Sequence, residues 1–525
     1  MNMHTLRPSL GRLLSSAALL FGVAAAAPAP AQENVLRVVV PSSIEAKIPS
    51  GTGPAFNQGL LRNVFETLTV VSPDQKLLPG LATDWSVSDD KLTWTFRLRE
   101  GVSFTDGTPF DADAVVRNID YIMAPENRIP SLDNLGPLSG ARKVDDHTVE
   151  LTTSVPFSGL PVRLAHTVAS MVSPASYDEY GADIPREIAS GTGPFMLESF
   201  ELPDRIVMTR NPDYWGGAPE IDGIDFDFIN DGQTRLAGLL SGQADMNFYL
   251  SPIDRPRVAG NPDFEVLSVP SIRAFVAHLP MGLPAMQDRK VREALNLAID
   301  REALANFIFS GSATALDSSI GPGQIGYRAA HQLPYDPERA EELFAEAGWS
   351  KNSDGILEKD GERFPTLTYL ASNGRYPGDD ALAQAVSGYL TEAGVPTELR
   401  IEEFATFIED ARNTARDAGW VTQIAWGFAS EGASMLCQVY VESNPLDFGG
   451  YDNPELETAC AEIDATFETD ARIRLIEETA AWVMDDYPAI FLLAPTYEVA
   501  TSTAFTGLQL SSSEYHSFAG VAPAE

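Results

Sequence analysis

Few residues of this chain have the types and spacing that catalysis or metal binding requires. Its six histidines stand at positions 4, 147, 166, 278, 331 and 516, so none has the spacing of a zinc site such as His-Glu-x-x-His. The sequence also lacks the Gly-x-Ser-x-Gly turn of serine hydrolases and the Gly-Lys-Ser/Thr loop that binds phosphates. No catalytic residue, metal or cofactor is therefore predicted.

Two segments match binding motifs only in part. Gly321-Pro-Gly-Gln-Ile-Gly326 has the glycine spacing of a dinucleotide-binding turn, but no strand precedes it and its proline stiffens it, which indicates a loop. The segment from Asp225 to Gly232 has the alternating acids of a calcium loop, yet Ile229 stands at a ligand position and no glutamate closes it. Paired acids such as Asp89 and Asp90 are too frequent here to indicate a glycosidase.

Length and charge restrict the class of protein. A chain of 525 residues is too long for one compact core, so two or more lobes are expected. The formal net charge is −38, and the acidic residues are spread along the chain. Such a surface repels nucleic acids and anionic lipids, so nucleic-acid binding is not expected.

The first 31 residues have the pattern of a signal peptide. Arg7 and Arg12 supply positive charge, and an apolar run from Leu13 to Ala27 follows. Small residues then lead to Ala31, where cleavage is expected. The alternative is an uncleaved membrane anchor, although the apolar run is short for a transmembrane span. The pattern predicts export to a Gram-negative periplasm.

The two cysteines, Cys437 and Cys460, allow one disulfide. An oxidising compartment permits the bond. Two buried free thiols are the alternative, because sequence does not give the Cα separation that a disulfide needs.

Hydrophobic periodicity predicts the elements that position any site. Residues 36–41 read as a strand, and 57–68 and 288–304 as amphipathic helices. Strands at 367–371, 397–401 and 420–426 alternate with helices at 380–393 and 404–418. That alternation predicts a parallel sheet covered by helices, and so an α/β fold.

Several short sequence segments, in a fixed order along the chain, resemble those of a known protein family. The series comprises Leu60-Leu-Arg-Asn-Val-Phe-Glu-Thr-Leu-Thr69, Leu78-Pro-Gly-Leu-Ala-Thr-Asp-Trp85, Phe96-Arg-Leu-Arg-Glu-Gly-Val-Ser-Phe-Thr-Asp-Gly-Thr-Pro109, Gly191-Thr-Gly-Pro-Phe195, Asn211-Pro-Asp-Tyr-Trp-Gly-Gly217 and Val291-Arg-Glu-Ala-Leu-Asn-Leu-Ala-Ile-Asp-Arg301. The series resembles the bacterial extracellular solute-binding proteins of family 5, the peptide, nickel and opine receptors of ABC importers. It extends from about residue 35 to about residue 494.

The resemblance implies a two-lobed periplasmic binding protein of type II, with an extra subdomain in the first lobe and the ligand in a cleft between lobes. The first lobe is expected at residues 32–271 and 494–525, with the subdomain at about 72–190. The second lobe is expected at 272–493. Strands near 269–275 and 491–497 should cross between the lobes. A monomer that binds a small molecule or peptide and docks to an inner-membrane ABC permease is implied.

Two departures from the family pattern concern peptide recognition. Peptide-binding members place an Asp for the ligand amine where this chain has Ala429, and Glu431 would substitute only if the loop bends differently. Dipeptide-binding members carry an Arg where this chain has Asp379, Asp380 and Ala381. A modified peptide, an opine-like or sugar-derived solute, and a chelated metal therefore remain open.

Two candidate site residues, Arg273 and Tyr497, lie near the expected crossings, and a third, Trp426, lies at the end of a predicted strand. Trp426, at the end of a strand, is expected to stack on a ligand or to pack in the core. Tyr497 is expected to hydrogen-bond a ligand or to make a hinge contact. Arg273 is expected to meet an anionic ligand group or to be a solvated hinge arginine.

Three further candidates lie after predicted strands. Glu45 would bind a cation or face water. Arg375 and Tyr376 would line the cleft or form a fixed turn before Pro377.

A binding receptor is the first hypothesis for the function. A secreted hydrolase would need two acids that converge in the cleft, and no sequence pattern supplies them. A chaperone-like surface would need exposed apolar grooves in place of an enclosed site.

Overall fold

The computed structural model describes residues 34–41, 46–51, 59–129, 132–201, 205–373, 375–414, 416–428 and 431–524. The predicted signal peptide lies outside these ranges. Within them, no helix has both the length and the apolar character that a membrane crossing needs.

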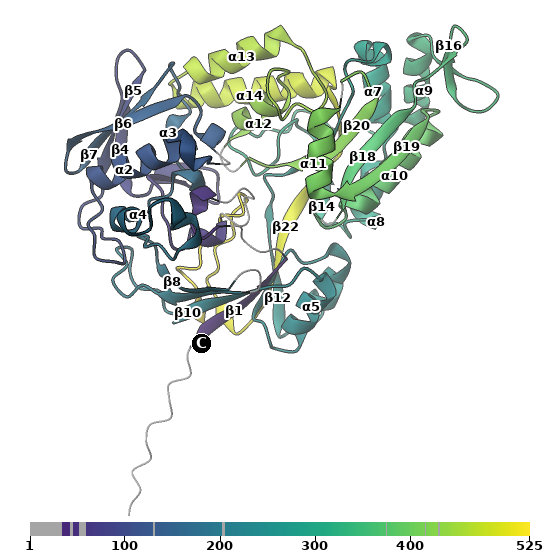
Figure 1. The fold of residues 1–525 in the computed structure, drawn as a ribbon. Helices are drawn as coiled ribbons and strands as arrows, with labels where there is room; N and C mark the ends of the chain where they lie inside the picture. Colours follow the sequence, from purple (N-terminus) through teal and green to yellow (C-terminus); the bar gives the residue numbers. More distant parts are fainter. Residues whose placement is uncertain are drawn as a thin grey trace, which may run out of the picture. The chain divides into compact units, whose positions relative to one another are not determined.

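The first large sheet contains the amino-terminal strand at its centre (Figure 1). Its order is β12-β22-β11-β1-β10-β9-β8, and β14 pairs with β22. The bounds are β1 Val35–Val40, β8 Phe195–Glu201, β9 Arg205–Arg210, β10 Gly223–Phe228, β11 Met246–Phe248, β12 Phe264–Pro270, β14 Ala313–Ala315 and β22 Leu493–Ser502. β1 runs parallel to β10 and β11.

The second large sheet has the order β19-β18-β20-β13-β21. Its strands are β13 Ala274–His278, β18 Leu367–Asn373, β19 Thr397–Glu403, β20 Trp420–Trp426 and β21 Ala489–Phe491. β18 is parallel to β19 and β20, as the alternation predicts. β13, which comes from outside the alternating region, pairs antiparallel with both β20 and β21, so the sheet is mixed.

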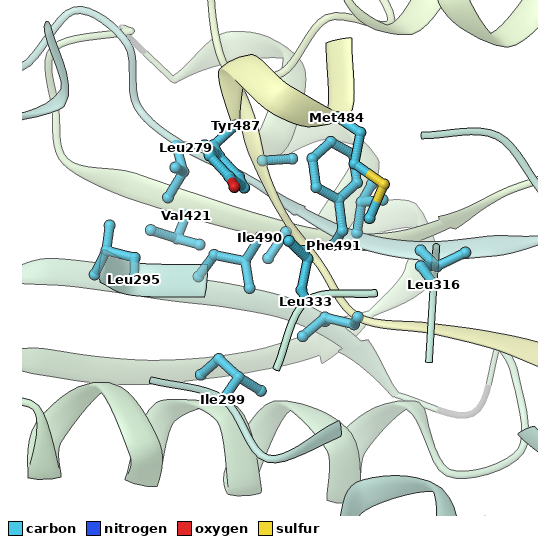
Figure 2. Packing of buried hydrophobic residues seen from close by; sticks show 14 of the residues in the cluster. Leu279, Leu295, Ile299, Leu316, Leu333, Val421, Met484, Tyr487, Ile490 and Phe491 are labelled. Atoms are coloured by element: carbon cyan, nitrogen blue, oxygen red, sulfur yellow. The ribbon is translucent and has the colours of Figure 1, made fainter. Parts of the chain in front are cut away.

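Helices cover both faces of this second sheet. Successive side chains of β18 point to opposite faces, so Tyr369 packs with α10 (Asp379–Glu392) and Leu370 with α11 (Phe404–Asn413). The larger core, on the Tyr369 face, includes Ile490 and Phe491 of β21 (Figure 2).

The predicted helix at 288–304 is two helices, α7 (Arg289–Leu297) and α8 (Arg301–Phe307). The break arises because the Asp300 side chain accepts a hydrogen bond from the backbone of Ala303 at 2.9 Å and begins α8. The helix predicted at 57–68 is also shorter, since only residues 59–61 of the described part are helical there.

The part of the chain that follows β3 and precedes β8 forms a four-stranded sheet with its own hydrophobic core. Its order is β4-β5-β7-β6, with bounds Ala82–Val87, Thr93–Leu98, Thr148–Thr153 and Leu138–Asp145. α2 (Ala112–Met123) packs on it, and the Asp111 carboxylate caps this helix. The short hairpin β2 (Thr69–Val71) and β3 (Leu77–Pro79) precedes it.

Two short connections within the described residues lead directly from a strand of one large sheet to a strand of the other. Residues 271–273 connect β12 to β13, and Leu492 connects β21 to β22. The remaining longer elements are α3 Leu160–Arg163, α4 Pro174–Tyr180, α5 Gly232–Leu240, α6 Arg255–Ala259, α9 Pro337–Glu346, α12 Gly432–Val439, α13 Pro454–Ala465 and α14 Thr469–Asp486. A disulfide joins Cys437 to Cys460 with 5.7 Å between their Cα atoms, so the alternative of two free thiols is wrong.

Candidate functional site

The candidate site lies where parallel strands of the two large sheets end. Tyr249 follows β11 directly, and Tyr376 lies three residues after the end of β18. Both line one cavity. Ligands of α/β sheets bind beyond the carboxyl ends of such strands. The wall also includes Ser271, Arg273, Tyr497, Glu498 and Glu514.

Arg273 is held in a buried ion pair within the protein. Its Nε and Nη2 donate to the two carboxylate oxygens of Glu514, at 2.6 and 3.0 Å. The Tyr249 hydroxyl donates to the same carboxylate at 2.8 Å. Burial opposes ionisation of Glu514, but Arg273 outweighs it, so the pKa of Glu514 lies below its usual value. Arg273 is 6% exposed, so it is not a solvated hinge arginine, and its contact with a ligand remains a prediction.

Arg375 is positioned by its neighbours but not neutralised by them. Its guanidinium carbon lies 5.4 Å from the ring centre of Tyr376 and 4.8 Å from that of Phe404. Its Nε is buried without a hydrogen-bond partner, and it forms no ion pair with any residue that the structure describes. Burial holds the pKa of Tyr249 well above its usual value, and the charge of Arg375 is close enough to act in the lowering direction on both Tyr249 and Glu514.

The side chain of Asp379 fixes the turn that contains Arg375. Its carboxylate accepts hydrogen bonds from the backbone N–H groups of Arg375 and Tyr376, each at 3.1 Å. The Tyr376 hydroxyl in turn accepts a bond from Arg273 Nη1 at 3.1 Å. The fixed turn and the lining of the cavity by Tyr376 are therefore compatible.

Tyr497 offers a buried donor at the cavity. The side chain is 5% exposed, and its hydroxyl has no hydrogen-bond partner in the described part of the chain. Its ring lies 4.7 Å from that of His516 and 5.2 Å from that of Tyr249. The hydroxyl is therefore available to a ligand, although ligand contact by Tyr497 remains a prediction.

Trp426 is half-buried and belongs to an aromatic cluster. Its Nε1 donates to His278 Nε2 at 2.8 Å, and its ring lies 5.3 Å from that of Phe448. These contacts account for its packing, and stacking on a ligand remains a prediction.

The carboxylate of Glu431 is not free to bind a ligand amine. It is 1% exposed, and both carboxylate oxygens accept hydrogen bonds from Arg472. Because both oxygens are already paired with Arg472, Glu431 does not take the place of the Asp that binds a ligand amine in peptide-binding members. The predictions for Glu45 and Ala429 concern positions outside the described residues.

Sequence reasoning missed Glu514 and Tyr249. Glu514 pairs with a residue 241 positions away, and no local pattern marks such a partner. Asp379, which the sequence marked only as a departure from the family, is the first residue of α10, and its carboxylate binds the backbone of the preceding turn. Over the ranges that the structure covers, no group of three or more His, Cys, Asp or Glu side chains is arranged to hold a metal.

This arrangement defines an α/β binding protein with two large sheets and a solute cavity at the ends of their parallel strands. The model of the bacterial extracellular solute-binding proteins, family 5 (middle part), matches residues 76–444, and the chain belongs to this family. Its relatives are periplasmic solute-binding proteins of ABC importers with the two-lobed fold, and such proteins are not enzymes.

One relative is the glutathione-binding protein GsiB of Salmonella paratyphi A. It is 30% identical over 492 residues, which cover 92% of this chain and 93% of that protein. Two solved structures have the same fold. NikA from Brucella suis with Fe(III)-EDTA has a TM-score of 0.83 at 23% identity, over 93% of this chain and 99% of NikA. DppA from Helicobacter pylori with the peptide STSA has a TM-score of 0.78 at 19% identity, over 94% and 98%.

Proposed function

We propose that this protein captures a small peptide-like solute that carries a carboxylate and delivers it to an ABC permease. One observation supports this most strongly, namely that Arg375 is a fixed cation without an anionic partner among the described residues. The acids of the cavity wall are paired, Glu514 with Arg273 and Glu498 with Arg255. A carboxylate is the group that best matches a free guanidinium.

Arg375 adjoins the cavity through Tyr376, whose ring it contacts and whose side chain lines the wall. The wall itself offers a second donor, the Tyr497 hydroxyl, which has no hydrogen-bond partner among the described residues and suits a carbonyl or carboxylate oxygen. The name of the relative GsiB supports a solute of tripeptide size with acidic ends.

A non-peptide solute is the second candidate. Ala429 stands where peptide-binding members carry an Asp, and Glu431 is paired with Arg472, so neither supplies the partner of an α-amine. An opine-like or sugar-derived acid or a metal chelate would still offer a carboxylate to Arg375 and would not need a partner for an α-amine.

The proposal also covers the export signal, the two lobes and the docking to the permease. Residues 1–31 are removed on export to the periplasm. Residues 32–271 with 494–525 form the first lobe, with a subdomain at about 72–190, and 272–493 form the second. The lobes close on the solute, and the monomer then docks to the permease and leaves the solute chemically unchanged.

Calorimetric titration of the mature chain with glutathione and with its glycine carboxamide tests the role of Arg375. We expect the wild type to bind the acid about tenfold or more tightly than the amide, because the amide cannot form the charge-assisted pair. In Arg375→Gln this preference should disappear. Arg363→Gln, which removes an exposed arginine paired with Asp354, is the matched control. An unchanged preference in Arg375→Gln would contradict the assignment.

A further inference from the structure

We propose that Ser158, Arg163, Glu431 and Arg472 form a closing contact between the four-stranded-sheet side of the first lobe and helices α12–α14 of the second. We infer that this closing contact sets how tightly every solute is retained, without touching the solute. The inference rests on the proposed function, since it assumes that solute is held by lobe closure.

Ser158 is the centre of the closing contact. Its backbone N–H donates to the carbonyl of Asp464 at 2.8 Å. Its hydroxyl donates to the carbonyl of Ile463 at 3.0 Å and accepts from Arg472 Nε at 2.8 Å. Ser158 follows β7 and precedes α3, whereas its three partners belong to α13 and α14. One serine therefore makes three hydrogen bonds to helices that lie about 300 positions later in the chain.

The charges at the closing contact come from both sides. Arg472 and Glu431 form a two-fold hydrogen-bonded pair beside α12. Arg163 of α3 brings its Nε to 4.0 Å from Glu431, and this Nε has no hydrogen bond. All three side chains are at most 10% exposed. Asp464 is a second acid near these charges, and burial raises its pKa to about 6.

Gly159 allows the two sides of the closing contact to lie close together. A Cβ atom at Gly159 would lie 2.9 Å from the Phe157 ring, 3.1 Å from Arg472 Nη2 and 3.3 Å from Glu431 Oε1. A larger residue at 159 would therefore require the side chains of Phe157 and Arg472 to shift. A second contact lies nearby, where the rings of Trp94 and Phe467 stack with centres 5.9 Å apart.

Separation of the two sides would break the bonds of Ser158 and expose Arg163 and Glu431 to water. The contact therefore favours the closed form whichever solute is present. The apparent affinity of a receptor scales with the fraction of molecules in the binding-competent form. A change at the closing contact should consequently weaken all solutes by one common factor, whereas a change at Arg375 should alter which solute is preferred.

Hydrogen exchange of the ligand-free mature chain tests the contact without a solute. Ser158→Ala removes the hydroxyl and leaves the Glu431–Arg472 pair in place. Ser154→Ala, at an exposed serine four positions earlier, is the control. In Ser158→Ala we expect exchange at 155–165 and 460–472 to rise together, about three- to tenfold, with the melting temperature within a few degrees of wild type. Exchange as in wild type, or increased exchange at 155–165 alone, would overturn the proposal.

Titration with glutathione and its carboxamide separates this inference from the proposed function. The closing contact predicts that Ser158→Ala weakens both ligands by the same factor, through faster release, and keeps the ratio between them. If Arg375→Gln abolishes the ratio while Ser158→Ala changes nothing, the closing contact fails and the carboxylate site stands. If neither probe binds, the exchange experiment still decides the closing contact.

Discussion

Arg273 and Glu514 form a buried ion pair with 2.6 Å between Nε and Oε1, although 241 positions separate them in the chain. Arg273 lies where the chain first passes between the two large sheets, and Glu514 lies in the carboxyl-terminal tail. The pair fixes the wall of the solute cavity and also supplies the carboxylate that Tyr249 contacts.

Glu514→Gln should destabilise the protein by about 3–5 kcal/mol, because it leaves Arg273 buried without a counter-charge. Urea unfolding followed by circular dichroism measures the loss. Arg363→Gln removes an exposed pair with Asp354 and should cost about 1 kcal/mol or less. Equal stabilities for Glu514→Gln and Arg363→Gln would show that the buried pair is not needed.

The disulfide between Cys437 and Cys460 closes a loop across α12 and α13, with a sequence separation of 23. The chain-entropy model gives a stabilisation of about 3 kcal/mol for a loop of this length. The double variant Cys437→Ser with Cys460→Ser should therefore unfold at lower urea concentration. Reduced wild type should match the variant, and a midpoint that does not respond to reductant would contradict the prediction.

Buried histidines should make the protein sensitive to acid. Burial lowers the pKa to about 3 for His166 and His278 and to about 4 for His516. The unfolded chain therefore binds more protons than the folded chain as the pH falls below about 6.5. Stability contributed by these groups is present above that pH and is lost progressively toward their folded pKa values.

One variant isolates this effect. His278 accepts a hydrogen bond from Trp426, so it is held neutral in the folded protein. His278→Asn should reduce the slope of unfolding free energy between pH 4 and 6 by about 1.4 kcal/mol per pH unit. His331→Asn, at a more exposed histidine, is the control. Equal slopes for wild type and His278→Asn would contradict the prediction.

Local patterns in the sequence predicted much of the fold. β18, β19 and β20 and the helices between them follow from alternation and periodicity, since each is set by short-range spacing. The break between α7 and α8 was missed because Asp300 fits a continuous helix pattern and also caps a new helix. Family resemblance, rather than periodicity, predicted that the chain crosses between two lobes.

The site was less accessible to sequence reasoning. Arg375 and Tyr376 were predicted to line the cleft or to form a fixed turn before Pro377, and Tyr497 was predicted on the segment that returns to the first lobe. The pairing state of a side chain depends on residues far away in the chain, as Arg273 with Glu514 and Glu431 with Arg472 demonstrate. Sequence therefore marked charged candidates without distinguishing Arg375, which is unpaired among the described residues, from the paired ones.

The central claim is that the solute is a small peptide-like acid held at Arg375. Mass spectrometry of the molecule released by denaturing the native protein, purified without added ligand, tests it most directly. The account predicts a compound of di- or tripeptide size with at least one carboxylate, which is absent from Arg375→Gln and present in Arg363→Gln. A released solute without a carboxylate, or equal amounts in both variants, would contradict the claim.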